Sequence, residues 1–162
     1  RLIEGASNGY IQFRMSVHHQ DYVVDSLAGN LIGAQKHLLK YYRLKYLINS
    51  ELEYYNDIID IKEIYKRMIY NSIYDEINMN TFNFVNAAFD NLLFRYPTQN
   101  EFNNSYSMIE DKVPHTLFGF SGSNKEDFVN LICNSREFYE GMVHWSYLTL
   151  VARTPTTQET CY

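Results

Sequence analysis

The chain has 162 residues and a formal net charge of -5, and 46% of its residues are hydrophobic while 20% are charged. This share of apolar side chains is enough to build a core, which excludes an intrinsically disordered chain. The acidic net charge and the dispersed Lys and Arg residues argue against nucleic-acid binding through phosphate neutralisation. A run of about 18 apolar residues does not occur, so we expect no transmembrane segment.

The first half of the chain predicts an extended arm followed by helices. From Tyr10 to Val17, apolar and polar residues alternate enough to predict a short strand or an extended segment that lies on a neighbouring element. Further on, Ser50 and Glu53 have the spacing of a capping box that begins a new helix. We divide the chain into an extended arm (1–17), a tyrosine-rich helical region (18–80) and a region of helical repeats (81–162), the last two either separate or one continuous domain.

Aromatic residues are abundant, with 15 tyrosines and 10 phenylalanines. Such side chains supply large contact areas, and tyrosine tolerates a half-exposed setting, so they suit contacts between proteins. We therefore predict that Tyr41, Tyr42 and Tyr46 contact a partner.

Basic residues gather on the same predicted helix. Lys36, Lys40 and Arg43 are spaced so that they share one helix face. This face is suited to a peripheral contact with anionic lipid head groups or with an acidic partner. The other interpretation, which we favour, is the solvated side of an amphipathic helix.

Histidines near the start of the helical region suggest a metal site. His18, His19 and Asp21 offer metal-binding side chains close together, and His37 would join them if the first helices pair. Adjacent residues on a helix point about 100° apart, so His18 and His19 cannot both face one ion. We therefore favour a structural role for these residues over zinc binding.

The second half of the chain contains one sequence pattern twice. The copies run from Phe84 to Glu101 and from Met142 to Glu159, at an offset of 58 residues. This is an internal repeat. The shared motif consists of Arg95, Pro97, Thr98 and Glu101 in the first copy and of Arg153, Pro155, Thr156 and Glu159 in the second.

Each copy of the motif predicts a helix, a stop and a new helix. In the first copy, Arg95 is expected in the last turn of a helix, where a cation offsets the partial charge of unpaired carbonyls. Pro97 forces the preceding residue out of helical geometry and so ends that helix. Thr98 and Glu101 then form a capping box for the next helix. The predicted architecture is a helical bundle with two related helix-turn-helix units in series.

Between the two copies lies the strongest loop signal in the chain. Residues 112–124 contain a proline and two glycines together with Leu117, Phe118 and Phe120. Apolar residues in a loop either contact a partner or fold back over a helix end, and we predict partner contacts here. After this loop, Ser123 and Glu126 predict a capping box, and Ser135 is expected to begin the last long helix.

Motifs for catalysis and for cofactor binding are missing from the sequence. None of the usual nucleophile, phosphate-loop, dinucleotide, zinc-protease or haem patterns occurs. The two cysteines, Cys133 and Cys161, have no spacing typical of a metal or disulfide framework. We expect Cys133 to be a core residue. We predict no active site and no cofactor.

Three motifs in one order carry a family resemblance. They are the capped helix SNKEDFVNLICNS, the turn from Ser135 to Phe138 and an aromatic helix that ends in R-x-P-T-x-x-E. This order resembles the helical linker domain of cyanobacterial phycobilisomes and related helical modules of bacterial envelope and secreted proteins. The resemblance covers Phe84 to Glu159. It implies an all-α scaffold that joins other proteins and performs no catalysis.

We therefore predict a non-catalytic interaction protein, an accessory subunit or linker in a larger bacterial assembly. Its predicted partners are other protein subunits. Its expected location is the cell envelope, in the periplasm or at the outer membrane, with the cytoplasm as the alternative. Two other functions stay open: a small metal-dependent enzyme that uses His18, His19 and Asp21, and a helical bundle that binds a ligand in an aromatic-lined cavity.

Overall fold

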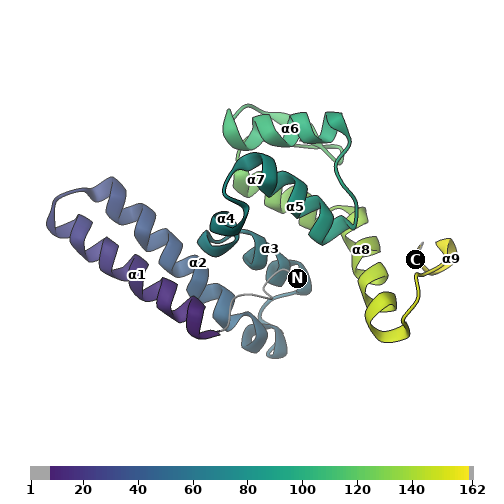
Figure 1. Ribbon diagram of the computed structural model, residues 1–162, viewed down its shortest axis with the longest axis horizontal. Coiled ribbons are helices and arrows are strands. Elements are labelled where there is room, and N and C mark those ends of the chain that lie inside the picture. Colours follow the sequence, from purple (N-terminus) through teal and green to yellow (C-terminus); the bar gives the residue numbers. More distant parts are fainter. Residues whose placement is uncertain (1–7, 161–162) are drawn as a thin grey trace. The chain divides into compact units, whose positions relative to one another are not determined.

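The computed structural model describes residues 8–160 and is all-α apart from one small hairpin (Figure 1), as predicted. The chain divides into two compact units, residues 1–77 and residues 78–162. This division lies close to the predicted boundary between residues 80 and 81. Each unit is described by itself below.

Unit 1 begins with a helical hairpin. Helices α1 (Asn8–Leu27) and α2 (Leu31–Tyr55) lie side by side (Figure 1) and are joined by a short turn. Gly29 has φ +75° in this turn, a conformation that glycine adopts without steric cost. Helices α3 (Ile61–Ile69) and α4 (Ser72–Asn78) follow.

The predicted extended arm is wrong where the structure describes it. Helix α1 already begins at Asn8, while residues 1–7 lie outside the described part of the chain. Ile11, Met15 and His18 recur at helical spacing, and this stripe faces inward: Ile11 and His18 are buried, and Met15 packs against the core. Residues 10–17 therefore form part of a helix, because their helical spacing buries apolar side chains, whereas the alternation of apolar and polar residues is weaker.

The predicted helix start at Ser50 is also wrong, because Ser50 lies inside α2. Its hydroxyl donates to the carbonyl of Tyr46 at 2.8 Å, one turn earlier in the same helix. The acidic partner of the predicted box, Glu53, binds Arg67 of α3 instead, with Nη1 and Oε2 2.7 Å apart. The polar residues of this stretch thus tie two helices together.

Unit 1 has a small apolar core and one buried polar link. Its core joins α1, α2 and α4 through Ile11, Leu44, Leu47 and Ile73, with Met15, Ile48 and Met68 packed around them. Asn71 is buried between α3 and α4. Its amide nitrogen donates to two α3 carbonyls, and its oxygen accepts from the amides of Ile73 and Tyr74. One side chain therefore ends α3 and begins α4.

Unit 2 is built around the first copy of the repeat. Helix α5 (Thr81–Leu93) buries a continuous apolar face, and α6 (Gln99–Glu110), α7 (Lys125–Cys133) and α8 (Arg136–Ser146) pack against it or against one another. The buried residues of α5 are Phe84, Val85, Ala88, Phe89, Leu92 and Leu93.

The predicted loop contains a two-stranded hairpin, β1 (His115–Leu117) paired antiparallel with β2 (Phe120–Gly122). Helix α8 continues into the π-helical turn η1 (Tyr147–Val151), and α9 (Thr157–Thr160) follows after a break. Cys133 is fully buried, as expected, whereas Cys161 lies outside the described residues.

Helix starts in unit 2 are capped by polar side chains. Thr98 and Glu101 form the predicted capping box at the start of α6, and Ser135 caps α8 by accepting from the amide of Phe138. The cap of α7 is Asn124 rather than the predicted Ser123. Asn is as good an N-cap as Ser, so the two neighbours compete for this position.

Candidate functional site

Arg95 and Arg153 occupy equivalent positions in two copies of one turn. The residue before each arginine ends the preceding helix in the left-handed conformation, with φ 55° at Phe94 and φ 56° at Ala152. Each guanidinium also lies over an aromatic ring six residues earlier. The distances from Cζ to the ring centroid are 5.3 Å for Arg95 over Phe89 and 4.8 Å for Arg153 over Tyr147.

Each arginine donates two hydrogen bonds to the glutamate of its own motif. Arg95 Nη1 and Nη2 donate to the two carboxylate oxygens of Glu101 at 2.9 and 2.7 Å. Arg153 donates to Glu159 at 3.0 and 2.7 Å. Such bidentate pairs fix orientation as well as distance. The prediction that Arg95 lies in the last helical turn is therefore wrong: it follows the end of α5, and its partners are carboxylates and the carbonyl of the next residue, Tyr96.

The first turn shifts the acidity of its glutamate strongly. The guanidinium of Arg95 and the hydrogen bonds from Thr98 hold the pKa of Glu101 at about 2. Arg153 and Thr156 likewise lower the pKa of Glu159. Both carboxylates are therefore ionised at neutral pH, and in each turn the glutamate forms an ion pair with the arginine of the same motif.

The two copies differ in what lies against them. Arg95 binds a second carboxylate, Glu137 at the start of α8, with Nε and Oε2 2.8 Å apart. One turn further along α8, Gly141 packs against the backbone of Leu92, where a Cβ would collide with the carbonyl oxygen. Among residues 8–160, Arg153 has no second carboxylate partner.

The apolar residues beside each turn differ in the same way. Leu92 and Leu93 in the first copy are 2% and 8% exposed. Their counterparts in the second copy, Leu150 and Val151, are 80% and 54% exposed. The second copy thus presents the apolar surface that neighbouring elements cover in the first copy.

The predicted tyrosine contacts lie on α2. Tyr42 and Tyr46 are 40% and 49% exposed and stack with their ring centroids 6.2 Å apart. Tyr41 is half-buried and packs edge-on against Tyr42. Tyr46 also lies near Arg67 of α3. Two of the three rings therefore offer a continuous aromatic surface to solvent.

The predicted contact loop is split between core and surface. Leu117 is buried, and Phe118 lies 6.1 Å from the ring of Phe89 in the core of unit 2. Phe120 is 68% exposed. Of the three residues, Phe120 alone is largely exposed and so in a position to meet a partner.

The basic residues of α2 have different surroundings. Lys36 and Lys40 are exposed, whereas Arg43 packs its guanidinium over the ring of Tyr70, 3.7 Å from the centroid. A cation held over a ring in this way contributes to the packing of unit 1. Two lysines are thus left for contact with an anionic surface.

The hairpin of unit 1 brings together a histidine cluster. One nitrogen of His18, one of His37 and one carboxylate oxygen of Asp21 all lie within 4.8 Å of one another. His18 and Asp21 are three residues apart on α1 and so share one face. His19 is not in this cluster; it is exposed, and its ring lies 5.7 Å from that of Tyr41.

His18 is the most buried member of the cluster, with 3% of its surface exposed. Burial, followed by the charges of Lys40 and Arg14, lowers the pKa of His18 to about 4. Its imidazole is therefore neutral at pH 7. Nε2 shares a hydrogen bond of 2.9 Å with the hydroxyl of Ser72, on α4.

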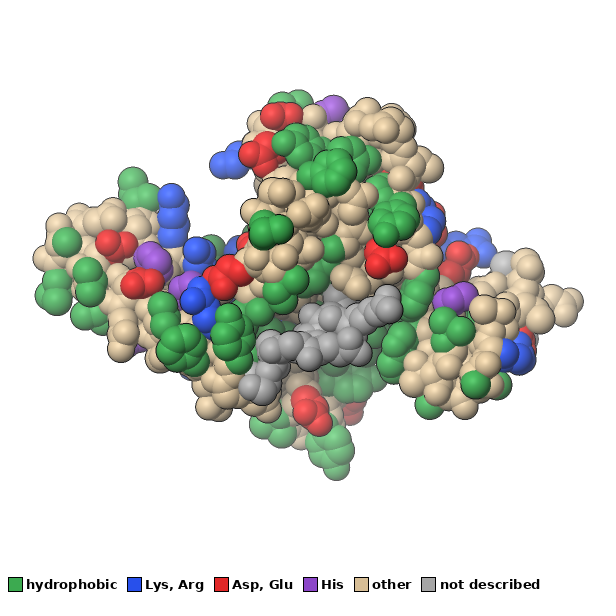
Figure 2. Space-filling model, in the orientation of Figure 1, with side chains coloured by type: hydrophobic (Ala, Val, Ile, Leu, Met, Phe, Trp, Pro, Cys, Tyr) green, Lys and Arg blue, Asp and Glu red, His purple; other side chains and the backbone are tan. Residues whose placement is uncertain are grey.

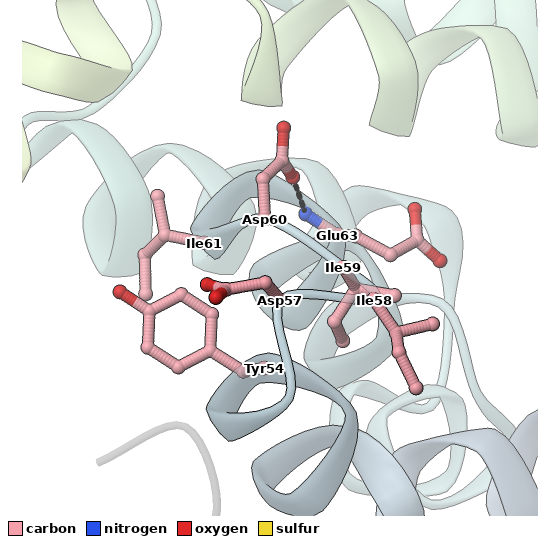
Figure 3. Close-up of a pocket in the computed structure, with 7 residues that line it drawn as sticks. All are labelled: Tyr54, Asp57, Ile58, Ile59, Asp60, Ile61 and Glu63. Atoms are coloured by element: carbon pink, nitrogen blue, oxygen red, sulfur yellow. Dashed lines mark hydrogen bonds between the residues drawn. The ribbon is translucent and has the colours of Figure 1, made fainter.

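A pocket at the connection between α2 and α3 is open to solvent (Figure 3). Its acidic side chains, those of Asp57, Asp60 and Glu63, point in different directions. Asp60 caps α3 by accepting from the amide of Glu63 at 2.9 Å, and this bond lowers the pKa of Asp60. Asp60 therefore serves the helix start, Glu63 pairs with Arg67, and the three carboxylates do not converge on a ligand.

Three side chains at these sites were not predicted from the sequence. Glu137 lies inside the recognised turn from Ser135 to Phe138, but its partner is 42 residues away. Ser72 bonds to His18 although 54 residues separate them in the sequence. Asp25 lies 3.8 Å from Nε2 of His37, and its spacing of four residues from Asp21 and seven from His18 on α1 is the sequence signal that places it on their face.

A comparison with protein-family models, with curated proteins and with solved structures produced no match. Over residues 8–160, none of the helices has the length and apolar character needed to cross a membrane.

Proposed function

We propose that this chain is a non-catalytic interaction protein, an accessory subunit or linker that joins helical subunits in a larger assembly. We propose the bacterial cell envelope as its location, because the sequence resembles helical modules of bacterial envelope proteins. The contact we propose lies at the second copy of the repeat and is formed by Arg153, Leu150 and Val151, here called the terminal turn surface.

The first copy supports this proposal by acting as an internal template. There, the same turn is covered by a helix start that supplies a glutamate to the arginine and a glycine to the helix end. The terminal turn surface has the same arginine geometry and exposed apolar residues at the matching positions. Exposed apolar surface beside a charged anchor is typical of protein contact sites.

The template also indicates the chemistry of the partner. We propose a helix that begins with a Ser-x-Glu-Phe turn and has a small residue at the place of Gly141. The glutamate would pair with Arg153, whose side chain is 48% exposed. The phenylalanine and the close helix contact would cover Leu150 and Val151.

A synthetic peptide of residues 134–146 tests the proposal, because it carries the helix start that covers the first turn. It is labelled and titrated with the full chain, and binding is followed by fluorescence anisotropy. Replacing Arg153 by Met removes a charge pair worth about 1 kcal/mol, so binding should weaken roughly fivefold. Leu150→Asp should weaken it further.

The matched control is Arg136→Met, which removes an exposed arginine of α8 that pairs within its own helix. It should leave peptide binding unchanged. A peptide with Glu137 replaced by Gln should bind the unaltered chain more weakly. Absence of binding, or equal binding by the Arg153→Met and Arg136→Met variants, would refute the proposal.

A further inference from the structure

We propose that His18, Asp21 and His37 form a binding site for a divalent transition-metal ion, with Zn²⁺ as the expected occupant. This site lies within unit 1 and is independent of the terminal turn surface. Figure 2 shows histidine and acidic side chains gathered on the α1–α2 hairpin.

The first argument is the state of the two histidine rings. Nδ1 of His18 and Nδ1 of His37 are both buried, and neither makes a hydrogen bond; His37 Nδ1 lies 3.3 Å from Asp21 Oδ2, but without the geometry of a hydrogen bond. A buried polar atom without a partner is costly and is usually explained by a missing water or ion. Two such nitrogens beside one carboxylate have a common explanation if they bind the same cation.

The second argument concerns the other nitrogen of each ring. Nε2 of His18 shares a hydrogen bond with Ser72 Oγ. Nε2 of His37 lies 3.8 Å from a carboxylate oxygen of Asp25, which is longer than a hydrogen bond but places a carboxylate beside this nitrogen. Metal-binding histidines usually direct their second nitrogen to a hydroxyl, carbonyl or carboxylate in this way, which fixes the tautomer and the ring orientation. Ser72 and Asp25 are therefore positioning residues in this proposal.

The third argument is distance. In a tetrahedral zinc site with bonds of about 2.1 Å, the ligand atoms lie about 3.4 Å apart. His37 Nδ1 and Asp21 Oδ2 are 3.3 Å apart, and all three ligand atoms lie within 4.8 Å. Small rotations of the side chains would close the set around an ion. Asp21 is half-buried, so the fourth position faces solvent and suits a water molecule.

The donor set selects the class of metal. Two imidazoles and one carboxylate suit Zn²⁺ and its neighbours Co²⁺, Ni²⁺ and Cu²⁺, whereas Ca²⁺ and Mg²⁺ prefer oxygen ligands throughout. Asp21 and Asp25 supply negative charge against the nearby cations Arg14 and Lys40. We therefore expect no binding of Mg²⁺ or Ca²⁺ at this site.

The test uses the full chain without a histidine tag, stripped with EDTA and titrated with Zn²⁺ by calorimetry. One ion should bind per chain. Asp21→Asn and His37→Gln should each weaken the affinity at least about tenfold, and Ser72→Ala about tenfold through the loss of orientation. Co²⁺ should give the visible absorption of a four-coordinate site in the unaltered chain and not in the Asp21→Asn or His37→Gln variants.

The matched control is His19→Gln, which removes the neighbouring histidine outside the cluster and should leave zinc affinity unchanged. Circular dichroism verifies that each variant is folded, and the more exposed Asp21 and His37 keep the test valid if His18 variants unfold. The proposal fails if Zn²⁺ does not saturate the chain. It also fails if His19→Gln weakens binding as much as His37→Gln.

Discussion

Arg95 binds Glu137, 42 residues further along the chain, and thereby fixes the start of α8 against the end of α5. The same guanidinium holds Glu101 at the start of α6. The Arg95 side chain thus connects the end of α5 with the starts of α6 and α8. In the described part of the chain, its counterpart Arg153 binds a carboxylate at one helix start only, that of Glu159 in α9.

We predict that Glu137→Gln lowers the free energy of unfolding by about 1 kcal/mol, because it weakens a charge-assisted bond that is partly exposed. Urea denaturation measures this change. Glu140→Gln is the control, since it breaks only an exposed pair within α8 and should cost less than about 0.5 kcal/mol. Equal effects of the two substitutions would contradict the role assigned to Arg95.

We predict that Thr98→Ala costs about 1 kcal/mol, because the hydroxyl caps α6 by accepting from the Glu101 amide. Thr156→Ala makes the same chemical change at α9, which has four residues and buries none of them. Its effect on global unfolding should be much smaller. Thermal unfolding of both variants checks this, and the prediction fails if Thr98→Ala leaves the melting temperature unchanged.

The sequence predicted some local interactions and none of the long-range ones: the box of Thr98 and Glu101 forms, whereas the same spacing at Ser50 and Glu53 lies inside α2. The capping box of Thr98 and Glu101 spans three residues, so spacing alone predicted it. The pairing of Arg95 with Glu137 depends on how α8 returns to α5, which no local pattern encodes. The sequence therefore predicted where helices begin and end better than it predicted what their end charges bind.

The histidine cluster shows the same division. The helical period correctly separated His18 from His19, and closeness in the sequence indicated that Asp21 belongs with the histidines. His37 joins only because α1 and α2 pair in one particular register. The extended arm was mispredicted because alternation over Tyr10 to Val17 was favoured over the stripe that begins at Ile11.

We predict that Gly141→Ala destabilises unit 2 by about 2 kcal/mol, because the added methyl would displace the backbone at Leu92. Alanine otherwise favours a helix over glycine, so a purely local effect would be stabilising. Glu140→Ala, at the adjacent and partly exposed position, is the control. A more stable Gly141→Ala variant would mean that α8 does not approach α5 so closely.

We predict that stability falls as the pH decreases from about 4.5 to about 2, because the pKa of Glu101 is lower in the folded chain than its ordinary value of 4.5. A depressed pKa means that the folded state resists protonation, so its contribution is complete above pH 4.5 and is lost below it. After allowance for solvent screening, this contribution is on the order of 2 kcal/mol. Glu101→Gln should be less stable at pH 7 and should lose less stability over this acid range. Urea midpoints at pH 7, 4.5 and 2.5 measure both effects, and parallel pH curves for the two proteins would contradict the prediction.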